Sequence, residues 1–386
     1  MSSSAPTTPT APHRPAKSGG LRGFWQRVSE GRAIEDLWSQ FAADARSSYG
    51  FYGKDVDWDE INKLPRRKRF FRIVNQFFWA LLNKLSPARR ILLLISLGFL
   101  VLSLLKSHDS SGSSSGMNFE IVAALLLLLL LSLELADKVI MKRDLEIARE
   151  IQAWLVPSAP PAIPNAEVAF HTRPQNSVAG DYYDAFYPNA PAEAGGKLML
   201  VMADVAGKSV PAALLMATLQ ASLHTLAPDG LSLTNLMERL NRYACAHSMD
   251  GGRFTTAVVV EFDPSTQLLS YVNAGHNSPV VRRSDGSIVR MESSGLPLGI
   301  TREANFPATS LQLGRGDTLI LFTDGVVEAF DAAGQEYSDP RWVSIIRNMP
   351  TLAAQDSLNF LMRDVDQFVG ATRQSDDITL LVLCCK

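Results

Sequence analysis

The residues of this chain that could do chemistry are aspartates, and they share one setting: each lies beside a glycine turn or a strand-like apolar run. They are Asp181, Asp204, Asp324 and the adjacent pair Asp376 and Asp377. A single aspartate at the end of a strand is more often a turn former than a ligand. Here the setting recurs from residue 181 to residue 377. This recurrence predicts carboxylates that converge on one edge of a sheet.

Converging carboxylates repel one another unless cations accompany them. No His or Cys at metal-ligand spacing lies near these aspartates in the sequence, so the donor atoms would all be oxygen. Oxygen donors suit hard cations such as Mg2+ and Mn2+ and do not suit zinc. The pattern therefore predicts a magnesium or manganese site.

The elements that must position these aspartates follow a mixed pattern of strands and helices. Strand-like runs lie at 198–203, 254–262, 268–273, 279–283, 288–291, 318–322 and 378–383. Helical periodicity lies at 211–226, 233–246 and 357–369. Turn signals at 263–264 and 284–286 join neighbouring runs as hairpins. Hairpins with separate helices predict an α+β fold with antiparallel sheets and not a doubly wound parallel sheet.

The first part of the chain has a different composition. Residues 1–20 are rich in Ser, Thr, Pro and Ala, which predicts a disordered tail. Residues 21–85 are expected to form a cytoplasmic amphipathic and juxtamembrane region, whose basic and aromatic end suits a lipid surface. The net charge of −2 gives no reason to expect a nucleic-acid partner.

Two apolar runs, 91–105 and 121–133, predict two transmembrane helices within residues 86–135. Buried core helices are the alternative, but leucines on every face leave no polar side for solvent. The Ser/Gly loop 107–116 between the runs is short, and basic residues crowd the two outer flanks. The positive-inside rule then places both termini in the cytoplasm. We expect a multi-pass protein of the inner (cytoplasmic) membrane with a cytoplasmic catalytic domain.

Residues 136–164 are predicted to form a linker helix that ends at a cluster of prolines. Hydrophobic residues recur every seven positions at Leu133, Ile140, Ile147 and Trp154. This spacing fits a short parallel coiled coil, which would make the protein a homodimer through the linker. A single helix packed on its own domain fits the spacing nearly as well, so both interpretations stay open.

Taken in order, the motifs resemble those of the stage II sporulation protein E-like family of metal-dependent serine/threonine phosphatases, a bacterial branch of the type 2C (PPM) phosphatases. The matching segments are AREIQ at 148–152, RP at 173–174, GDYYD at 180–184, DVAGK at 204–208, PAAL at 211–214, FTT at 254–256, NAGHN at 273–277, GLPLG at 295–299, GD at 316–317, TDGV at 323–326 and DDIT at 376–379. The ordered set covers residues 145–386 and is much more specific than any one piece. The chain departs from the family pattern at Ala179 and Ser209, where glycine is usual.

The resemblance implies a four-layer α-β-β-α sandwich at residues 165–386 with two Mn2+ or Mg2+ ions at one edge. In this scheme Asp204 bridges both ions. Asp181 and the Val205 backbone carbonyl serve one ion, and Asp324 and Asp376 serve the other. The catalytic residues, acting through an activated water, are then Asp204, Asp181 and Asp324, with Asp377, His276 and Lys208 in support. Which of Asp376 and Asp377 is the ligand stays open, and a structural role for His276 is favoured over proton donation.

The resemblance also implies an activity, the hydrolysis of phosphoserine or phosphothreonine in a regulatory phosphoprotein such as an anti-sigma-factor antagonist. The second hypothesis is a non-catalytic, membrane-tethered module that binds partners with the same fold. The intact set of aspartates favours the enzyme. A metal-dependent nuclease would also use carboxylates, but no basic groove pattern accompanies them.

Overall fold

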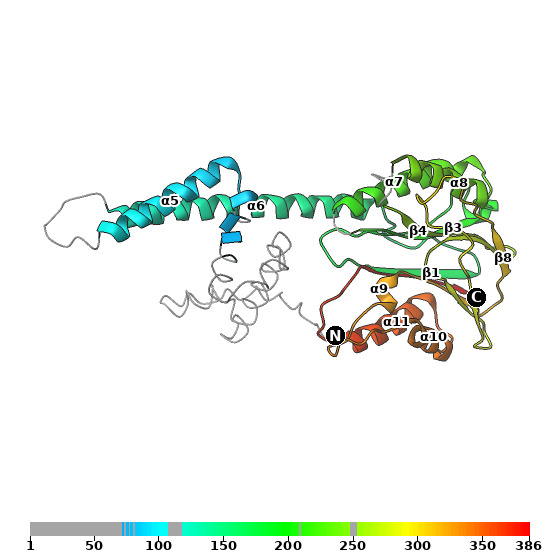
Figure 1. Ribbon diagram of the computed structural model, residues 1–386. Helices are drawn as coiled ribbons and strands as arrows, with labels where there is room; N and C mark the ends of the chain where they lie inside the picture. Colours follow the sequence, from blue (N-terminus) through cyan, green and yellow to red (C-terminus); the bar gives the residue numbers. More distant parts are fainter. Residues whose placement is uncertain are drawn as a thin grey trace, which may run out of the picture. The chain divides into compact units, whose positions relative to one another are not determined.

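The computed structural model describes residues 82–106, 118–207, 210–247 and 253–386, together with Arg72, Asn75, Gln76, Phe78 and Trp79 (Figure 1). The predicted tail 1–20, most of the predicted region 21–85, the loop 107–116 and Lys208 lie outside these residues. The chain divides into two compact units between Asp137 and Lys138, and each is described by itself.

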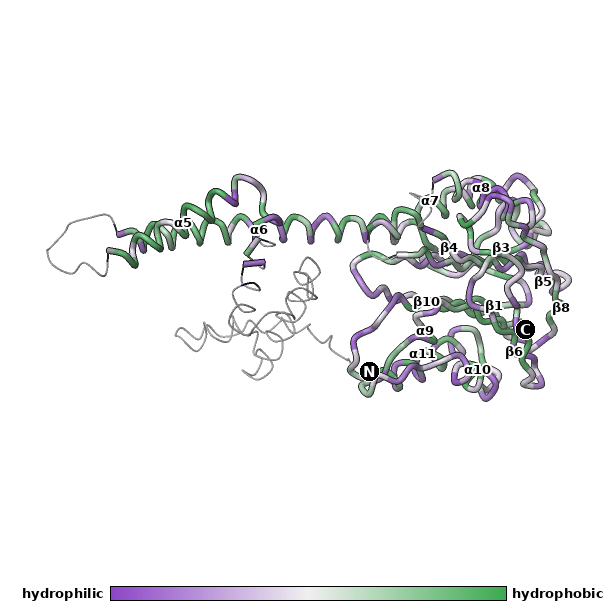
Figure 2. Tube along the Cα trace, in the orientation of Figure 1, coloured by the Kyte–Doolittle hydropathy of each residue, from purple (hydrophilic) through white to green (hydrophobic). Residues whose placement is uncertain are grey.

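The first unit contains helix α5 (Pro87–Lys106) and the beginning of helix α6 (Phe119–Trp154). The two helices lie side by side, and both are hydrophobic along most of their length here (Figure 2). At one end Arg89 bonds Glu134 and Asp137 at 2.9 and 2.6 Å, and at the other Ser103 donates to Glu120 at 2.8 Å. Most of their leucines are exposed, so this pair of helices has an apolar outer surface.

Helix α6 runs without a break for 36 residues. The sequence predicts a transmembrane segment and a separate linker helix on either side of residue 135, but no glycine or proline lies between Phe119 and Trp154 to interrupt the helix. The helix ends at Trp154, shortly before Pro157, as the proline cluster predicts.

The second unit is built on two five-stranded antiparallel sheets. In spatial order, sheet A contains β1 (Ala166–Arg173), β10 (Ile378–Cys385), β9 (Thr318–Phe322), β6 (Val280–Arg282) and β7 (Ile288–Arg290). Sheet B contains β2 (Asp181–Phe186), β3 (Leu198–Val205), β4 (Thr255–Asp263), β5 (Leu268–Ala274) and β8 (Thr309–Gln312). The prediction of an α+β fold with antiparallel sheets is confirmed.

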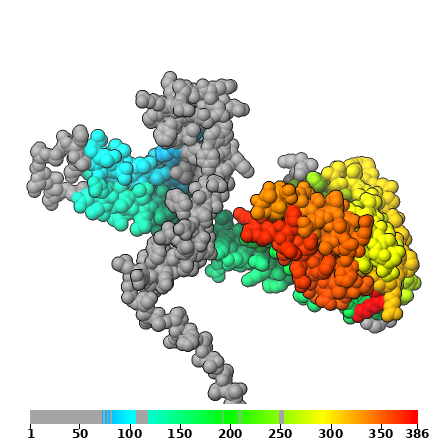
Figure 3. All heavy atoms as spheres, turned by 90° about the horizontal axis from the view of Figure 1, so that it is seen from below, coloured from blue at the N-terminus to red at the C-terminus, as the bar shows by residue number. Residues whose placement is uncertain are grey.

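Helices cover the outer face of each sheet, so the domain has four layers (Figure 1). Helices α7 (Val210–Leu226) and α8 (Leu233–His247) pack on sheet B, with the short η2 (Ala227–Asp229) between them. The other three are α9 (Asp324–Val327), α10 (Asp339–Asn348) and α11 (Ala354–Val369), which pack on sheet A. Figure 3 shows the orange and red surface that α10 and α11 form. A short η1 (Ala192–Ala194) precedes β3.

The central strands are buried on both faces. In β3, Leu198, Leu200 and Met202 pack between the two sheets, whereas Met199 and Val201 pack under α7 and α8. In β10, Leu381 and Leu383 face the inter-sheet core and their neighbours face α11. Strands that are apolar on both sides read as continuous hydrophobic runs, which is why β3, β9 and β10 are visible in the sequence.

Candidate metal centre at the edge of the sandwich

Two of the predicted site residues lie directly opposite each other in sheet B. Asp181 begins β2 and pairs with Asp204 near the end of β3. The residues two positions away, Tyr183 and Met202, face the inter-sheet core, so both carboxylates lie on that same face of sheet B. Like charges at directly opposite positions of a sheet are destabilising, so this pair needs a compensating partner.

The other two aspartates come from neighbouring strands of sheet A. Asp324 directly follows β9 at the start of α9, and Asp376 lies in the turn that enters β10. Gly325 lets these two turns touch, because a Cβ atom at this position would lie 1.9 Å from the carbonyl oxygen of Asp377. The glycine of the TDG motif therefore serves the close approach of the two acidic turns.

The electrostatics of Asp204 join the two sheets into one site. Burial and then the charges of Asp324, Asp376, Asp377 and Glu328 raise the pKa of Asp204 to about 7. Burial is also the main cause that raises the pKa of Asp181 well above its usual range, and the charge of Asp204 adds to it. The structure thus brings together Asp181, Asp204, Asp324 and Asp376, a set that we call the acidic edge. Glu328, which belongs to the same family motif as Asp324, adds its charge to this cluster.

Asp377 differs from Asp376 in what its carboxylate does. Its Oδ1 accepts a hydrogen bond from the backbone N–H of Gln175 at 2.6 Å, and its Oδ2 accepts one from Gly180 at 2.7 Å. Both oxygens therefore hold the loop that leads into β2. Asp376 accepts the N–H of Asp377 through Oδ1 at 2.9 Å.

A small space lies between Asp181 and the end of β3. A Cβ atom at Gly180 would lie 3.3 Å from the Val205 carbonyl oxygen and 3.7 Å from Oδ1 of Asp204. A side chain at this position would crowd the Val205 carbonyl, and glycine avoids this contact. The donor atoms at the acidic edge are carboxylate and carbonyl oxygens, which fit a hard divalent cation.

Within the residues that the structure describes, no three His, Cys, Asp or Glu side chains already stand close enough to share one ion. Asp324 and Asp376 are nevertheless near enough to Asp204 that their charges, after burial, contribute to its raised pKa.

His276 is placed inside the domain. It is 4% exposed, its Nδ1 lies 2.9 Å from the Thr256 hydroxyl, and its backbone N–H donates to Asn273 at 2.8 Å. Burial lowers the pKa of His276 to about 4, although the Phe322 backbone opposes this effect. A buried, neutral histidine with these bonds has a structural part in the NAGHN turn.

Three threonines also belong to the site, although none of them is among the predicted site residues. Thr323 and Thr379 donate to Oδ2 of Asp181 at 2.8 and 2.5 Å, and Thr172 lies 3.1 Å from Thr379. The motifs mark Thr323 and Thr379, but threonine is common in strands for its branched side chain alone, so the sequence does not show that these hydroxyls bond Asp181.

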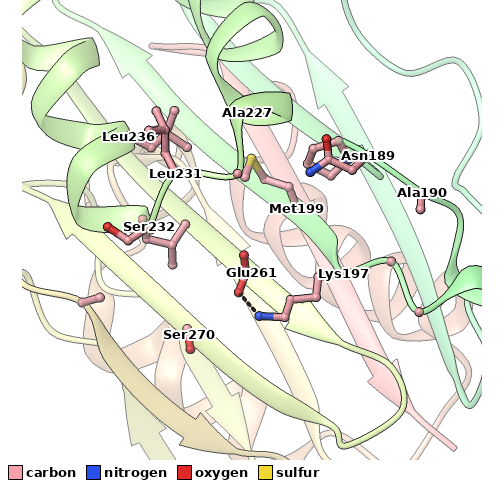
Figure 4. Close-up of a pocket in the computed structure, with 16 residues that line it drawn as sticks. Asn189, Ala190, Lys197, Met199, Ala227, Leu231, Ser232, Leu236, Glu261 and Ser270 are labelled. Carbon is pink, nitrogen blue, oxygen red and sulfur yellow. Dashed lines mark hydrogen bonds and ion pairs between the residues drawn. The ribbon is translucent and has the colours of Figure 1, made fainter.

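A separate cavity of about 680 Å³ lies at the opposite end of sheet B from Asp204 (Figure 4). Lys197 and Glu261 point toward each other in it and form an ion pair at 2.8 Å, while Met199 and Leu236 line its apolar side. It contains none of the predicted site residues, so it is not part of the acidic edge.

Comparison with known proteins identifies the fold and the family. The SiaA-PP2C domain of Pseudomonas aeruginosa superposes with a TM-score of 0.56 at 19% identity, covering 65% of this chain and 99% of that one. The PP2C phosphatase domain of SpoIIE from Bacillus subtilis, with a fragment of its regulatory domain, superposes with a TM-score of 0.50 at 19% identity, over 58% and 64% of the two chains. The second unit therefore has the PP2C phosphatase fold.

Two curated relatives come from Bacillus subtilis (strain 168). Phosphoserine phosphatase RsbU is 27% identical over 188 residues, which are 48% of this chain and 54% of RsbU. Phosphoserine phosphatase RsbP is 27% identical over 192 residues, which are 48% of this chain and 46% of RsbP. This chain thus spans about half the length of these curated relatives.

Fold and acidic edge together define a PP2C-type phosphatase domain. Residues 194–386 match the family Stage II sporulation protein E (SpoIIE), and the chain belongs to this family. The matched region contains Asp204, Asp324 and Asp376, whereas Asp181 lies just before it.

Proposed function

We propose that this chain is a metal-dependent phosphoprotein phosphatase that removes phosphate from serine or threonine. The observation that carries the proposal is the convergence of four aspartates from two sheets: Asp181 pairs with Asp204 in sheet B, and burial together with the charges of Asp324 and Asp376 from sheet A raises the pKa of Asp204 to about 7. Such a cluster is stable as a set of anions only with a cation. Membership of a phosphatase family and the identity with two phosphoserine phosphatases support the same activity.

In this proposal two ions, each Mn2+ or Mg2+, would be held at the acidic edge. Asp204 would serve both ions, Asp181 and the Val205 carbonyl would serve one of them, and Asp324 and Asp376 would serve the other. Asp376 is favoured over Asp377 as the ligand, because both oxygens of Asp377 already bind backbone N–H groups. The chemistry that such ions supply is Lewis acidity, which lowers the pKa of water and offsets charge on the phosphoryl oxygens.

The chain's own residues position this site, and they provide no cysteine nucleophile for a covalent mechanism at the acidic edge. Asp377 holds the loop between Gln175 and Gly180 through two hydrogen bonds, and these bonds fix the position of Asp181 at the start of β2. No cysteine lies at the acidic edge, since Cys384 and Cys385 are buried in β10 and Cys245 is in α8. A covalent phosphocysteine route therefore has no nucleophile there among the described residues.

We further propose that α5 and the first part of α6 anchor the protein in the inner membrane, with the phosphatase domain in the cytoplasm. Three described helices are long and apolar enough to span a membrane: Pro87–Leu105, Phe119–Trp154 and Val210–Asp229. The third packs on sheet B through Ala212, Met216 and Leu223, so it has a place in the domain core. The first two expose their leucines, which favours lipid as their neighbour.

The substrate that we propose is a regulatory phosphoprotein, such as an anti-sigma-factor antagonist. Pairing of two copies through the heptad positions of α6 is part of the same proposal, because Ile140, Ile147 and Trp154 are exposed. A non-catalytic binding module is the alternative. The presence of all four aspartates in one cluster favours the enzyme.

The test is phosphate release from p-nitrophenyl phosphate and from a phosphoserine protein by the full chain in detergent. We expect turnover that needs added Mn2+ or Mg2+, is abolished by chelator and is lost in Asp204→Asn. Mn2+-independent turnover, or equal turnover by Asp204→Asn, would overturn the assignment of the acidic edge.

A further inference from the structure

Three adjacent strands of sheet A each have a threonine at the last inward-facing position near the acidic edge. On β1, β10 and β9 the inner positions are apolar, for example Val168, Leu381 and Leu321. The next inner position beyond the apolar residues is threonine in each case: Thr172, Thr379 and Thr323. Thr172 pairs with Thr379 in the β1–β10 register, and Leu380 pairs with Phe322 in the next, so the three lie in one row. We call these residues the threonine row.

The threonine row meets a carboxylate of the opposite sheet. Asp181 projects from sheet B, and its Oδ2 lies 2.8 Å from the Thr323 hydroxyl and 2.5 Å from the Thr379 hydroxyl. Asp181 is 5% exposed, and Thr323 and Thr379 are fully buried. Hydroxyl donors to a buried carboxylate are charge-assisted hydrogen bonds, which are the strong ones.

The hydrogen bonds of the row run in one direction. The Thr379 hydroxyl gives its proton to Asp181, so it can only accept from Thr172. The Thr323 hydroxyl accepts the backbone N–H of Thr379 at 3.0 Å and gives its own proton to Asp181. A rival acceptor for Thr323, the Asp377 carbonyl, is farther away at 3.5 Å. The hydroxyls of Thr323 and Thr379 therefore both donate to one oxygen of Asp181, Oδ2, and Thr172 donates to Thr379.

We propose that the threonine row is a positioning device for metal binding by Asp181. Two hydroxyls of the row, on sheet A, donate to Oδ2 of Asp181. These bonds fix the rotation of the carboxylate and leave Oδ1 as the oxygen that binds the ion. This inference rests on the proposed function, because Asp181 is a ligand only if the acidic edge binds metal.

The role belongs to the hydroxyls and not to the shape of threonine. Valine has nearly the same shape as threonine and fits a buried strand, but it cannot donate. Serine keeps the donor and loses a methyl group. The pair Thr379→Val and Thr379→Ser therefore separates positioning from packing.

A matched control lies on the same two strands. Thr318 is a buried threonine on β9 whose hydroxyl is 3.7 Å from the sulfur of Cys384 on β10, at the far end from Asp181. Thr318→Val removes a buried hydroxyl from the same pair of strands without touching the acidic edge.

The experiment is a Mn2+ titration of the full chain in detergent, in which electron paramagnetic resonance reports the free ion, with the melting temperature measured in chelator. We expect the dissociation constant of the Asp181 ion to rise about 10- to 100-fold in Thr379→Val, as for other residues that orient metal ligands. Thr379→Ser should stay within about threefold of wild type, and Thr318→Val should leave the constant unchanged. A double variant with Thr323→Val should be weaker still.

Each contrary result has a distinct meaning. If wild type binds no more Mn2+ than Asp204→Asn, the proposed function fails. If wild type binds Mn2+ and Thr379→Val binds it equally well, only the positioning role fails. If Thr379→Ser is as weak as Thr379→Val, packing explains the effect and the positioning role is overturned.

Discussion

Aspartates with similar neighbours have different tasks at the acidic edge. Asp376 and Asp377 are adjacent in the sequence, yet both carboxylate oxygens of Asp377 accept hydrogen bonds from the loop before β2. The sequence shows that acidic residues gather here, but it does not assign their tasks, because those depend on which backbone N–H groups face each carboxylate. The role of the threonine row cannot be predicted from the sequence for a similar reason. Its hydroxyls meet Asp181 only because sheet B packs opposite sheet A.

Replacing Asp324 with asparagine tests the metal assignment. Asp324→Asn keeps the size of the side chain and removes a charge, so the fold should persist and the activity should fall about 100-fold or more. In metal-free buffer the melting temperature should stay equal or rise, because repulsion with Asp204 is relieved. Phosphatase rates and melting curves with and without Mn2+ measure both effects.

The matched change for Asp324→Asn is Asp263→Asn, in the β4–β5 turn where the carboxylate accepts from Ser265. This variant should keep the Mn2+ dependence of wild type. If Asp324 only shaped its turn, Asp324→Asn would instead melt earlier in chelator and keep near-normal turnover per folded molecule.

The buried His276 gives a pH dependence of stability with a definite sign. Its folded pKa is about 4, against an ordinary value of 6.5, so above pH 6.5 both states are neutral and its contribution is constant. As pH falls from 6.5 to 4 the unfolded chain takes up a proton that the folded chain does not. Stability should fall by up to roughly 3 kcal/mol over this window.

Denaturant unfolding of wild type and His276→Gln at several pH values isolates this effect, since the other titrating groups are shared. The stability difference between the two proteins should shrink as the pH drops from 6.5 to 4. A difference that stays constant over this window would show that His276 is not held neutral.

At the scale of elements, apolar runs predicted seven of the described strands, β3 to β7, β9 and β10, and the strands that are apolar on both faces are among them. Runs at β3, β9 and β10 were predicted within two residues of their observed bounds, and so were α7 and α8. β2 was not predicted as a strand, because Asp181 and Asp184 interrupt its apolar pattern and the segment was interpreted only as an acidic motif. Asp184 is buried in a network with Tyr182 and His224, which satisfies its charge. The edge strands β1 and β8 are more polar and were missed.

The end of α6 is hydrogen-bonded to the loop that leads into β2. Gln152 accepts from the N–H of Ala179 at 2.9 Å and donates to its carbonyl at 2.7 Å, two residues before Asp181. Gln152→Ala should cost about 1–3 kcal/mol, because two buried backbone groups lose their partner. It should also speed hydrogen exchange in the last turns of α6. Urea unfolding and exchange mass spectrometry measure these effects.

Gln355→Ala is the control for Gln152→Ala, because Gln355 bonds only Asn359 on the surface of α11. It should change neither quantity appreciably. Unchanged exchange near residue 152 in Gln152→Ala would mean that packing alone holds this part of α6.

At the scale of the whole molecule, the proposed membrane hairpin makes a prediction about topology. Basic residues flank the outer sides of the two helices, so the loop 107–116 should face outward and both termini inward. In a background without the native cysteines, Ser113→Cys should react with a membrane-impermeant thiol reagent in intact cells. Labelling at position 113 only after lysis would contradict the hairpin.

The order of strands in sheet A has a consequence for biosynthesis. β1 pairs with β10, and Ala166 lies opposite Cys385, a separation of 385 − 166 = 219 residues. At the usual rate of translation, roughly 10–45 s pass between the synthesis of β1 and the synthesis of β10. Until then sheet A lacks the strand between β1 and β9, and Asp181 lacks Thr379. Such non-local pairing folds slowly and leaves hydrophobic strand edges open, so newly made chains should depend on chaperones until β10 is added.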